Sequence, residues 1–134
     1  MKTYQYYMGG KWHSAADGST FEIKKPYNGE LIARVPNVGK KEAEKAIAVA
    51  AQAYVGWSQS TPAERAALFF KSAEIVKRRR VEIAKLLAEE TGSTISFATF
   101  QQDLVAATLE QAAAWNYLPK GEVLETNQRG SHSI

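Results

Sequence analysis

The spacing of apolar residues along the chain changes at about residue 39. Before that point, short segments such as 21–24 and 31–35 alternate apolar and polar side chains, which is the pattern of β-strands. After it, apolar residues recur every three or four positions, the spacing that places them on one face of an α-helix. Strands come first and helices follow, so we expect an α+β fold.

Two hairpins are predicted in residues 1–38. Residues 4–14 read as two strands around Gly9-Gly10, because paired glycines suit the positive φ angles of a tight turn. Segments 21–24 and 31–35 flank a longer loop that contains Asn28-Gly29, another hairpin signal. Residues 1–38 are therefore expected to form a small antiparallel β-hairpin segment.

About four amphipathic helices are predicted in residues 39–118. The first ends near Gly56. Residues 61–92 form either an antiparallel helix pair or one long bent helix, which starts at the capping box Thr61-Pro62-Ala63-Glu64 and stops at Gly92. The last helix begins at about Thr94 and ends before Pro119.

The apolar side of the last predicted helix is long and well defined. Its members are Phe97, Phe100, Leu104, Ala107, Thr108, Ala112 and Trp115. Four amphipathic helices need apolar surface to cover, and two hairpins offer little. Either the helices form a bundle of their own, or their apolar faces belong against a further domain. Residues 119–134 are mostly polar and are expected to form a tail.

Composition places the chain among globular proteins. Its 134 residues are enough for one ordinary domain, with 45% apolar and 23% charged residues. The net charge of +3 is too small to indicate nucleic-acid binding by itself. No run approaches membrane-spanning length, and the first residues lack the apolar segment of a signal peptide. We therefore expect a cytoplasmic protein with no membrane partner.

Candidate catalytic chemistry is sparse. The sequence contains no cysteine, so it offers neither a thiol nucleophile nor a thiolate zinc site. His13 and His132 have no carboxylate at ligand spacing, and we expect no metal site. Neither G-x-G-x-x-G nor a P-loop is present. No residue is assigned to catalysis or to cofactor binding.

The one cluster of charge is the basic run Lys77-Arg78-Arg79-Arg80. As a functional feature, it would contact phosphates and make the protein a weak basic nucleic-acid binder. As a structural feature, it places cations near a helix C-terminus, where they complement the macrodipole. We favour the structural interpretation and expect no nucleic-acid partner.

Several short motifs, in this order and at these spacings, resemble the start of the aldehyde dehydrogenases. The resemblance covers residues from about 6 to 124 and rests on these segments: Tyr7-Met8-Gly9-Gly10-Lys11-Trp12, Lys25-Pro26-Tyr27-Asn28-Gly29-Glu30 with Ile32 and Val35, the alanine-rich helix ending in Gly56-Trp57, Thr61-Pro62-Ala63-Glu64-Arg65, and Glu89-Glu90-Thr91-Gly92. Residues 91–94, Thr-Gly-Ser-Thr, depart from the Thr-Gly-Lys common in that superfamily and look more like branches that act on aromatic aldehydes.

The resemblance implies that this chain is a truncated part of a larger α/β fold and lacks its Rossmann core. In that family the residues that hold NAD(P), the general-base glutamate and the nucleophilic cysteine lie beyond the segment that resembles this chain. NAD(P) and a small aldehyde substrate are thus expected only in the complete enzyme. The resemblance also places Phe100 and Leu104 at the mouth of the substrate tunnel, although both positions equally suit core packing.

We therefore interpret the chain as an N-terminal fragment of an NAD(P)-dependent aldehyde dehydrogenase, an oxidoreductase that converts aldehydes to carboxylic acids. Alone it is expected to be inactive and to self-associate, as a dimer or a higher oligomer. A small helical self-association or interaction module is the alternative from another class, and the weak nucleic-acid binder is the third.

Overall fold

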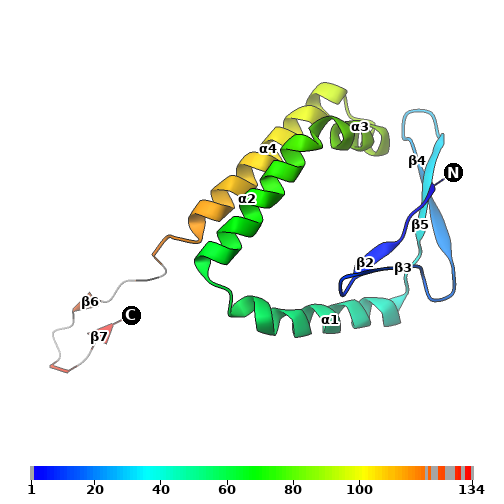
Figure 1. Ribbon diagram of the computed structural model, residues 1–134. Helices are drawn as coiled ribbons and strands as arrows, with labels where there is room; N and C mark the ends of the chain where they lie inside the picture. The colour runs from blue at the N-terminus through cyan, green and yellow to red at the C-terminus, as the bar shows by residue number, and fades with distance from the viewer. Residues whose placement is uncertain (1, 120, 122–123, 126–128, 131, 134) are drawn as a thin grey trace.

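The computed structural model describes residues 2–119, 121, 124–125, 129–130 and 132–133 (Figure 1). The described strands are β1 (Lys2–Thr3), β2 (Tyr6–Met8), β3 (Lys11–His13), β4 (Thr20–Lys24), β5 (Leu31–Pro36), β6 (Leu124–Glu125) and β7 (His132–Ser133). The described helices are α1 (Lys40–Ser58), α2 (Pro62–Arg78), α3 (Arg80–Thr91) and α4 (Ile95–Trp115). The order of strands and then four helices confirms the expected α+β class.

The first predicted hairpin is present as β2 and β3. Tyr7 lies opposite Trp12, and their rings meet edge to face with centroids 5.1 Å apart. Gly9 and Gly10 have φ angles of 60° and 81°, which L side chains rarely adopt. The turn is therefore the one that the paired glycines predict.

The second predicted hairpin is also present, but the β segment is not wholly antiparallel. Strand β4 runs antiparallel to β5, whereas β1 pairs with β5 in parallel, with Lys2 beside Ala33. The hairpin of β2 and β3 forms a sheet of its own. Both antiparallel hairpins are as predicted, and the parallel strand β1 was not predicted, because a two-residue strand is too short to show an alternating pattern.

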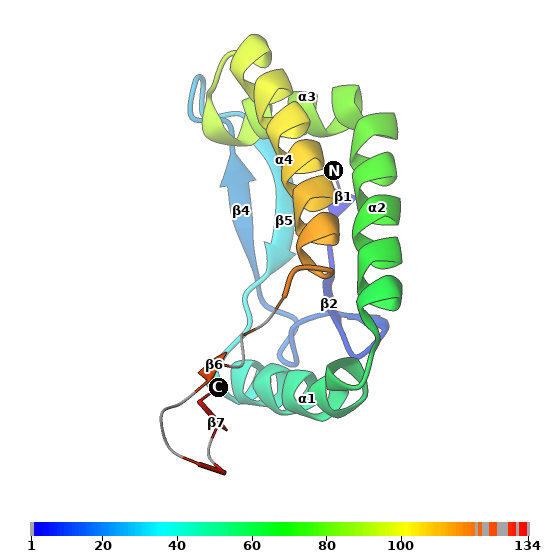
Figure 2. The same ribbon diagram turned by 90° about the vertical axis from the view of Figure 1, so that its left-hand side faces the viewer.

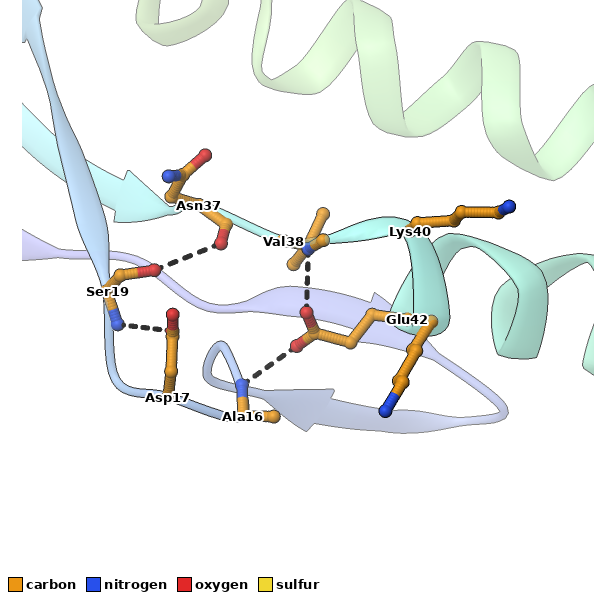
Figure 3. A pocket seen from close by; sticks show the side chains of 9 residues that line it. Ala16, Asp17, Ser19, Asn37, Val38, Lys40 and Glu42 are labelled. Carbon is orange, nitrogen blue, oxygen red and sulfur yellow. Dashed lines mark hydrogen bonds between the residues drawn. The ribbon is translucent and has the colours of Figure 1, made fainter.

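Helix α1 begins after Gly39 and ends two residues beyond the predicted stop at Gly56. Its first turn is tied to the loop before β4 by the carboxylate of Glu42. This carboxylate accepts the backbone N–H of Gly39 at 2.7 Å and that of Ala16 at 2.8 Å (Figure 3). None of the residues of α1 is buried, although its apolar spacing predicts a packed face.

The segment from 61 to 92 forms two helices, α2 and α3, with a break at Arg79. The predicted capping box is confirmed, since the Glu64 carboxylate accepts the Thr61 N–H at 2.7 Å and the Glu64 N–H donates to the Thr61 hydroxyl at 3.3 Å. Gly92 ends α3 in the left-handed region with φ 71°, as predicted. Helix α2 packs mainly against α4 and has little contact with α3. Figures 1 and 2 show α2 and α4 side by side.

Alanines fill the helix interface. The buried residues of the three packed helices are Ala66 and Ala73 on α2, Ala84 on α3, and Ala98, Gln102, Ala106 and Ala113 on α4. Small side chains at regular helical spacing let α2, α3 and α4 approach closely. Within the described residues, no large side chain is fully buried. The helices therefore make close contacts without a core of large apolar side chains.

The described chain is open. The accessible surface of the whole chain is 10516 Å², whereas a compact protein of 14.8 kDa exposes about 7,000 Å². Helix α1 extends away from the α2–α4 pair and lies at the bottom of the view in Figure 1. The amphipathic helices could either form a bundle of their own or pack their apolar faces against a further domain. The open structure supports the second interpretation.

The predicted tail contains an antiparallel pairing that the sequence pattern did not indicate. Strand β6 pairs with β7, with Leu124 opposite Ser133. The side chain of His132, considered above as a metal ligand, lies outside the described residues.

Candidate functional site on helix α4

Helix α4 presents one face to its helix neighbours and the opposite face to solvent. Thr94 begins the helix, its hydroxyl accepting the Phe97 N–H at 3.3 Å. The packed face carries the buried residues Ala98, Gln102, Ala106 and Ala113. At 100° per residue, the predicted apolar stripe is centred on the other side of the helix.

Phe100 and Leu104, the two predicted site residues, share this outer side. Their exposed fractions are 57% and 49%, so core packing within this chain does not explain them. Of the two roles left open for these positions, packing inside the helical segment is not observed, because the smaller alanines take that place. The alternative role of these positions as a wall facing something outside the chain remains a prediction.

Phe97 extends this wall by one turn and was not among the predicted site residues. Its ring lies 6.5 Å from that of Phe100 at an angle of 37° between the planes, within the range of favourable aromatic pairs. It is 51% exposed. The sequence could have indicated it, because residues three positions apart, such as Phe97 and Phe100, share one face of a helix. We call Phe97, Phe100 and Leu104 the α4 outer face.

Both charged residues of α4 lie on the flank of the helix, beside this face, and pair with neighbouring helices. Asp103 accepts two hydrogen bonds of 2.6 Å from Arg80, and Glu110 pairs with Lys77. The hydrogen bonds from Arg80 hold the pKa of Asp103 below its ordinary value. A surface helix of a globular protein usually presents charged groups to water. The α4 outer face is instead uncharged, as expected of a surface that another apolar surface covers.

The basic run is part of the helix packing. Of its four cations, Lys77 pairs with Glu110, Arg79 with Glu82 at 2.7 Å, and Arg80 with Asp103. The carboxylates partly neutralise the run, and the two that lie on α4, Asp103 and Glu110, link the ends of α2 and α3 to that helix. This arrangement favours the structural interpretation of the run over phosphate binding.

A shallow hollow of about 450 Å³ lies where α1 meets the loop before β4 (Figure 3). Several of its polar groups are paired within the chain. The Asp17 carboxylate accepts the Ser19 N–H at 2.8 Å, and the Ser19 hydroxyl donates to the carbonyl of Asn37 at 3.1 Å. The side chain of Ser19 and then its backbone N–H lower the pKa of Asp17. Together with the Glu42 contacts, these bonds make the hollow a structural junction.

The described residues contain no group of three or more histidines and carboxylates placed to hold a metal ion. His13 belongs to the first hairpin, where its ring stacks on Tyr6 at 5.5 Å and its Nε2 lies 3.2 Å from the carbonyl oxygen of Met8. Among the described helices, none has both the length and the apolar character needed to cross a bilayer.

The profile of the aldehyde dehydrogenase family matches residues 12–134, nearly the whole chain. The chain therefore belongs to the aldehyde dehydrogenase family, as the motifs predict. The structure agrees with this assignment, because the chain superposes on solved aldehyde dehydrogenases with TM-scores near 0.9.

Individual relatives are similar over almost all of this chain. The vanillin dehydrogenase of Pseudomonas sp. (strain HR199 / DSM 7063) is 34% identical over 127 residues, which are 95% of this chain and 26% of that protein. The solved salicylaldehyde dehydrogenase of Pseudomonas putida G7, complexed with salicylaldehyde, is 27% identical with a TM-score of 0.89, and the match covers 97% of this chain and 27% of that one. A betaine aldehyde dehydrogenase variant of Staphylococcus aureus, in complex with NAD+, is 29% identical with a TM-score of 0.87, covering 94% and 26%. The chain thus spans about a quarter of the length of these relatives and corresponds to a fragment of an aldehyde dehydrogenase.

Proposed function

We propose that this chain is the N-terminal part of an NAD(P)-dependent aldehyde dehydrogenase that oxidises an aldehyde to a carboxylic acid. The proposal rests on the family match, which covers residues 12–134 of this chain. The matched relatives are about four times as long as the chain. The exposed apolar surface supports it, because a helical frame without a large-residue core is suited to packing against the rest of such an enzyme.

In this proposal, the chain supplies a wall of the substrate passage. Phe100 and Leu104 are the substrate-contacting residues, since they lie on one exposed and uncharged face. Aromatic aldehydes are the proposed substrate class. Two observations support it: the relatives include a vanillin and a salicylaldehyde dehydrogenase, and the wall itself carries a pair of phenylalanine rings.

The catalytic chemistry is proposed to reside outside these residues. A thiolate attacks the aldehyde carbon in covalent catalysis of this kind, and this sequence contains no cysteine. The sequence also contains no glycine-rich phosphate motif, so we propose that NAD(P) binds only in the complete enzyme. Titrating NAD+ and NADP+ while following the fluorescence of Trp12, Trp57 and Trp115 tests this. Saturable binding at micromolar cofactor contradicts the proposal.

A chimera tests the proposed function directly. The matched segment of the Pseudomonas vanillin dehydrogenase is replaced by this chain, and NAD(P)H formation is followed by absorbance with vanillin as substrate. We expect a folded chimera that oxidises vanillin. The matched control is the same enzyme with the segment deleted, which should lose activity. A chimera that folds and binds NAD(P) but oxidises no aldehyde contradicts the proposal.

We also propose that the chain self-associates when it is produced alone. The support is its surface, which exceeds that of a compact protein by about 3,500 Å². A typical stable interface needs only about 800 Å² from each partner. A cytoplasmic location and the lack of a nucleic-acid partner, both expected from the sequence, remain part of this proposal.

A further inference from the structure

The elements of this chain are arranged as an open frame, whose sides are α1, the α2–α4 pair, α3 and the β4–β5 hairpin (Figure 1). Side-chain contacts fix the corner between α1 and α2. Arg65 donates through Nε to the Ser60 hydroxyl at 2.8 Å and through Nη2 to the Ser58 carbonyl at 3.2 Å. Its guanidinium also lies 5.6 Å from the centre of the Trp57 ring. These contacts tie the end of α1 to the first turns of α2.

The corner between the β4–β5 hairpin and α3 is closed in a similar way. Lys25 Nζ lies 3.5 Å from the Glu89 carboxylate, and Pro26 Cβ lies 3.5 Å from the position of a Cβ on Gly92. The junction at the start of α1 and the ion pairs of α4, both described above, hold the other two corners. The frame is thus fixed at its corners by contacts within the chain.

The frame has the same shape with and without further protein. In the described part of the chain, every buried side-chain nitrogen and oxygen atom has a hydrogen-bond partner. The frame also superposes on solved aldehyde dehydrogenases with TM-scores near 0.9, although the match is only about a quarter of each of those chains. This chain by itself therefore has the shape that its counterparts have within much longer chains.

Helix α1 carries an apolar face that the rest of the described chain leaves open. Ile47 and Tyr54 are 70% and 65% exposed, and residues seven positions apart lie on the same side of a helix. Ala51 lies between them and is also exposed. The Lys40–Glu44 ion pair occupies the first turns on this side, so the apolar part begins at Ile47. We call Ile47, Ala51 and Tyr54 the α1 apolar face.

The remainder of an aldehyde dehydrogenase is the partner that fits this face. Helix α1 has 19 residues and none of them is buried, whereas helices gain most of their stability in proteins from packing an apolar face. The counterparts of the frame belong to chains of which the match covers only about a quarter. The other three quarters of such a chain are the protein with which the frame occurs.

We propose that this chain binds the remaining three quarters of an aldehyde dehydrogenase as a preformed frame, with the α1 apolar face in the interface. The two parts then stay together without a peptide bond between them. A surface that is fixed before binding loses little conformational freedom on binding, which favours affinity. This inference rests on the proposed function and adds to it that the frame is recognised by its surface.

A cleavable form of the vanillin dehydrogenase chimera tests the inference. A protease site is inserted after residue 134, and the folded chimera is purified and then cleaved. We expect the two parts to co-elute from size exclusion at about 1 μM, and the oxidation of vanillin to stay within about twofold of the uncleaved chimera. The isolated chain should give a helical circular dichroism spectrum and a cooperative melt. An isolated chain without helix signal overturns the preformed frame.

Two variants of α1 test the position of the interface. Ile47→Glu and Gln52→Glu each add one negative charge at an exposed position, but the two side chains point about 140° apart around the helix. The dissociation constant of the cleaved parts should rise at least about tenfold in Ile47→Glu and less than about twofold in Gln52→Glu. Helix content should be equal in the two variants. An equal rise in both variants overturns the assignment of the α1 apolar face to the interface.

The outcomes separate this inference from the proposed function. Parts that dissociate after cleavage of an active chimera overturn the inference and leave the proposed function standing. Parts that co-elute, from a chimera that binds NAD(P) but oxidises no aldehyde, support the interface and contradict the proposed function. If the chimera does not fold, vanillin dehydrogenase itself is cleaved after its matched segment and mixed with an excess of this chain carrying an affinity tag. The tagged chain should then retain the remainder of the enzyme on the affinity resin, and failure to retain it overturns the inference.

Discussion

The guanidinium of Arg80 holds the carboxylate of Asp103 with two hydrogen bonds of 2.6 Å, one to each carboxylate oxygen. Arg80 is the first residue of α3 and Asp103 lies in the first half of α4, so the pair fixes the turn at Arg79 against the neighbouring helix. This geometry is the planar, two-pronged match that arginine makes with carboxylates.

The first prediction concerns acid stability. The hydrogen bonds from Arg80 lower the pKa of Asp103 from its ordinary 3.8. A carboxyl whose pKa is lower in the folded state stabilises the fold above its unfolded pKa, and this stabilisation is lost as the pH falls through the folded value. Between about pH 6 and about pH 2, the Tm of Asp103→Asn should therefore fall less than that of the wild type.

The matched control for this pH dependence is Glu44→Gln, because Glu44 meets Lys40 only at 3.8 Å on the open side of α1. A loose exposed pair of this kind contributes little to stability, so Glu44→Gln should leave the Tm close to that of the wild type. The Arg80–Asp103 pair is partly exposed, so the difference in Tm should be small and should shrink further in high salt. Equal profiles for Asp103→Asn and the wild type at low salt contradict the prediction.

The second prediction concerns the alanine interface. Ala106 is buried between the packed helices, and Ala107 is exposed on the outer side of α4. Ala106→Leu should lower the free energy of unfolding by about 1–3 kcal/mol, because the extra side chain forces the helices apart. Ala107→Leu adds the same atoms to the same helix and should change it by less than about 0.5 kcal/mol. Urea titration measures the free energy of unfolding of both variants. Equal losses in the two variants would show that Ala106 does not lie on the packed face of α4.

The third prediction compares two glycines. Gly92 has φ 71°, and a Cβ there would also touch Pro26 at 3.5 Å. Gly92→Ala should cost about 1–2 kcal/mol because an L side chain in the left-handed region meets the following carbonyl. Gly56 lies inside α1 with open space around it, so Gly56→Ala should stabilise the chain by about 0.5–1 kcal/mol. Thermal melts followed at 222 nm should move in opposite directions.

The fourth prediction concerns the start of α2. The Thr61 hydroxyl accepts the Glu64 N–H, and the Glu64 carboxylate accepts the Thr61 N–H. Thr61→Ala removes the side-chain half of this exchange and should cost about 0.5–2 kcal/mol of unfolding free energy. Thr61→Ser keeps a hydroxyl in place and should cost much less. A Ser variant as unstable as the Ala variant would show that the methyl group, and not the cap, matters here.

Local features of this fold could be predicted from the sequence because nearby residues determine them. The turn at Gly9-Gly10, the cap at Thr61 and the stop at Gly92 each depend on φ angles or hydrogen bonds within a few positions. The same holds for the two hairpins.

The face of α4 that packs could not be predicted in the same way. Apolar spacing favours the stripe of Phe100 and Leu104 as the core side, yet Ala98 and Ala106 are the buried residues. Which face of α4 is buried depends on how closely α2, which is distant in the sequence, approaches it. The small buried residues of α2 allow a close approach on the face of α4 that carries the alanines. The pairing of Arg80 with Asp103 depends on the same approach, so the role of the basic run could be argued only in general terms.

The last prediction concerns substrate selection by Phe100 and Leu104. Four residues apart on α4, they belong to one wall, and the proposed function puts an aldehyde against that wall. In the chimera with vanillin dehydrogenase, Phe100→Ala and Leu104→Ala should change the ratio of kcat/KM for an aromatic and a small aliphatic aldehyde by about 10- to 200-fold. The cofactor KM should not move, since the wall does not contact NAD(P) in this proposal. The control is Val105→Ala, an exposed truncation on the flank of the same helix, which should leave the ratio unchanged. If both aldehydes lose activity equally and the Tm drops, the two side chains support the fold of the complete enzyme and do not select its substrate.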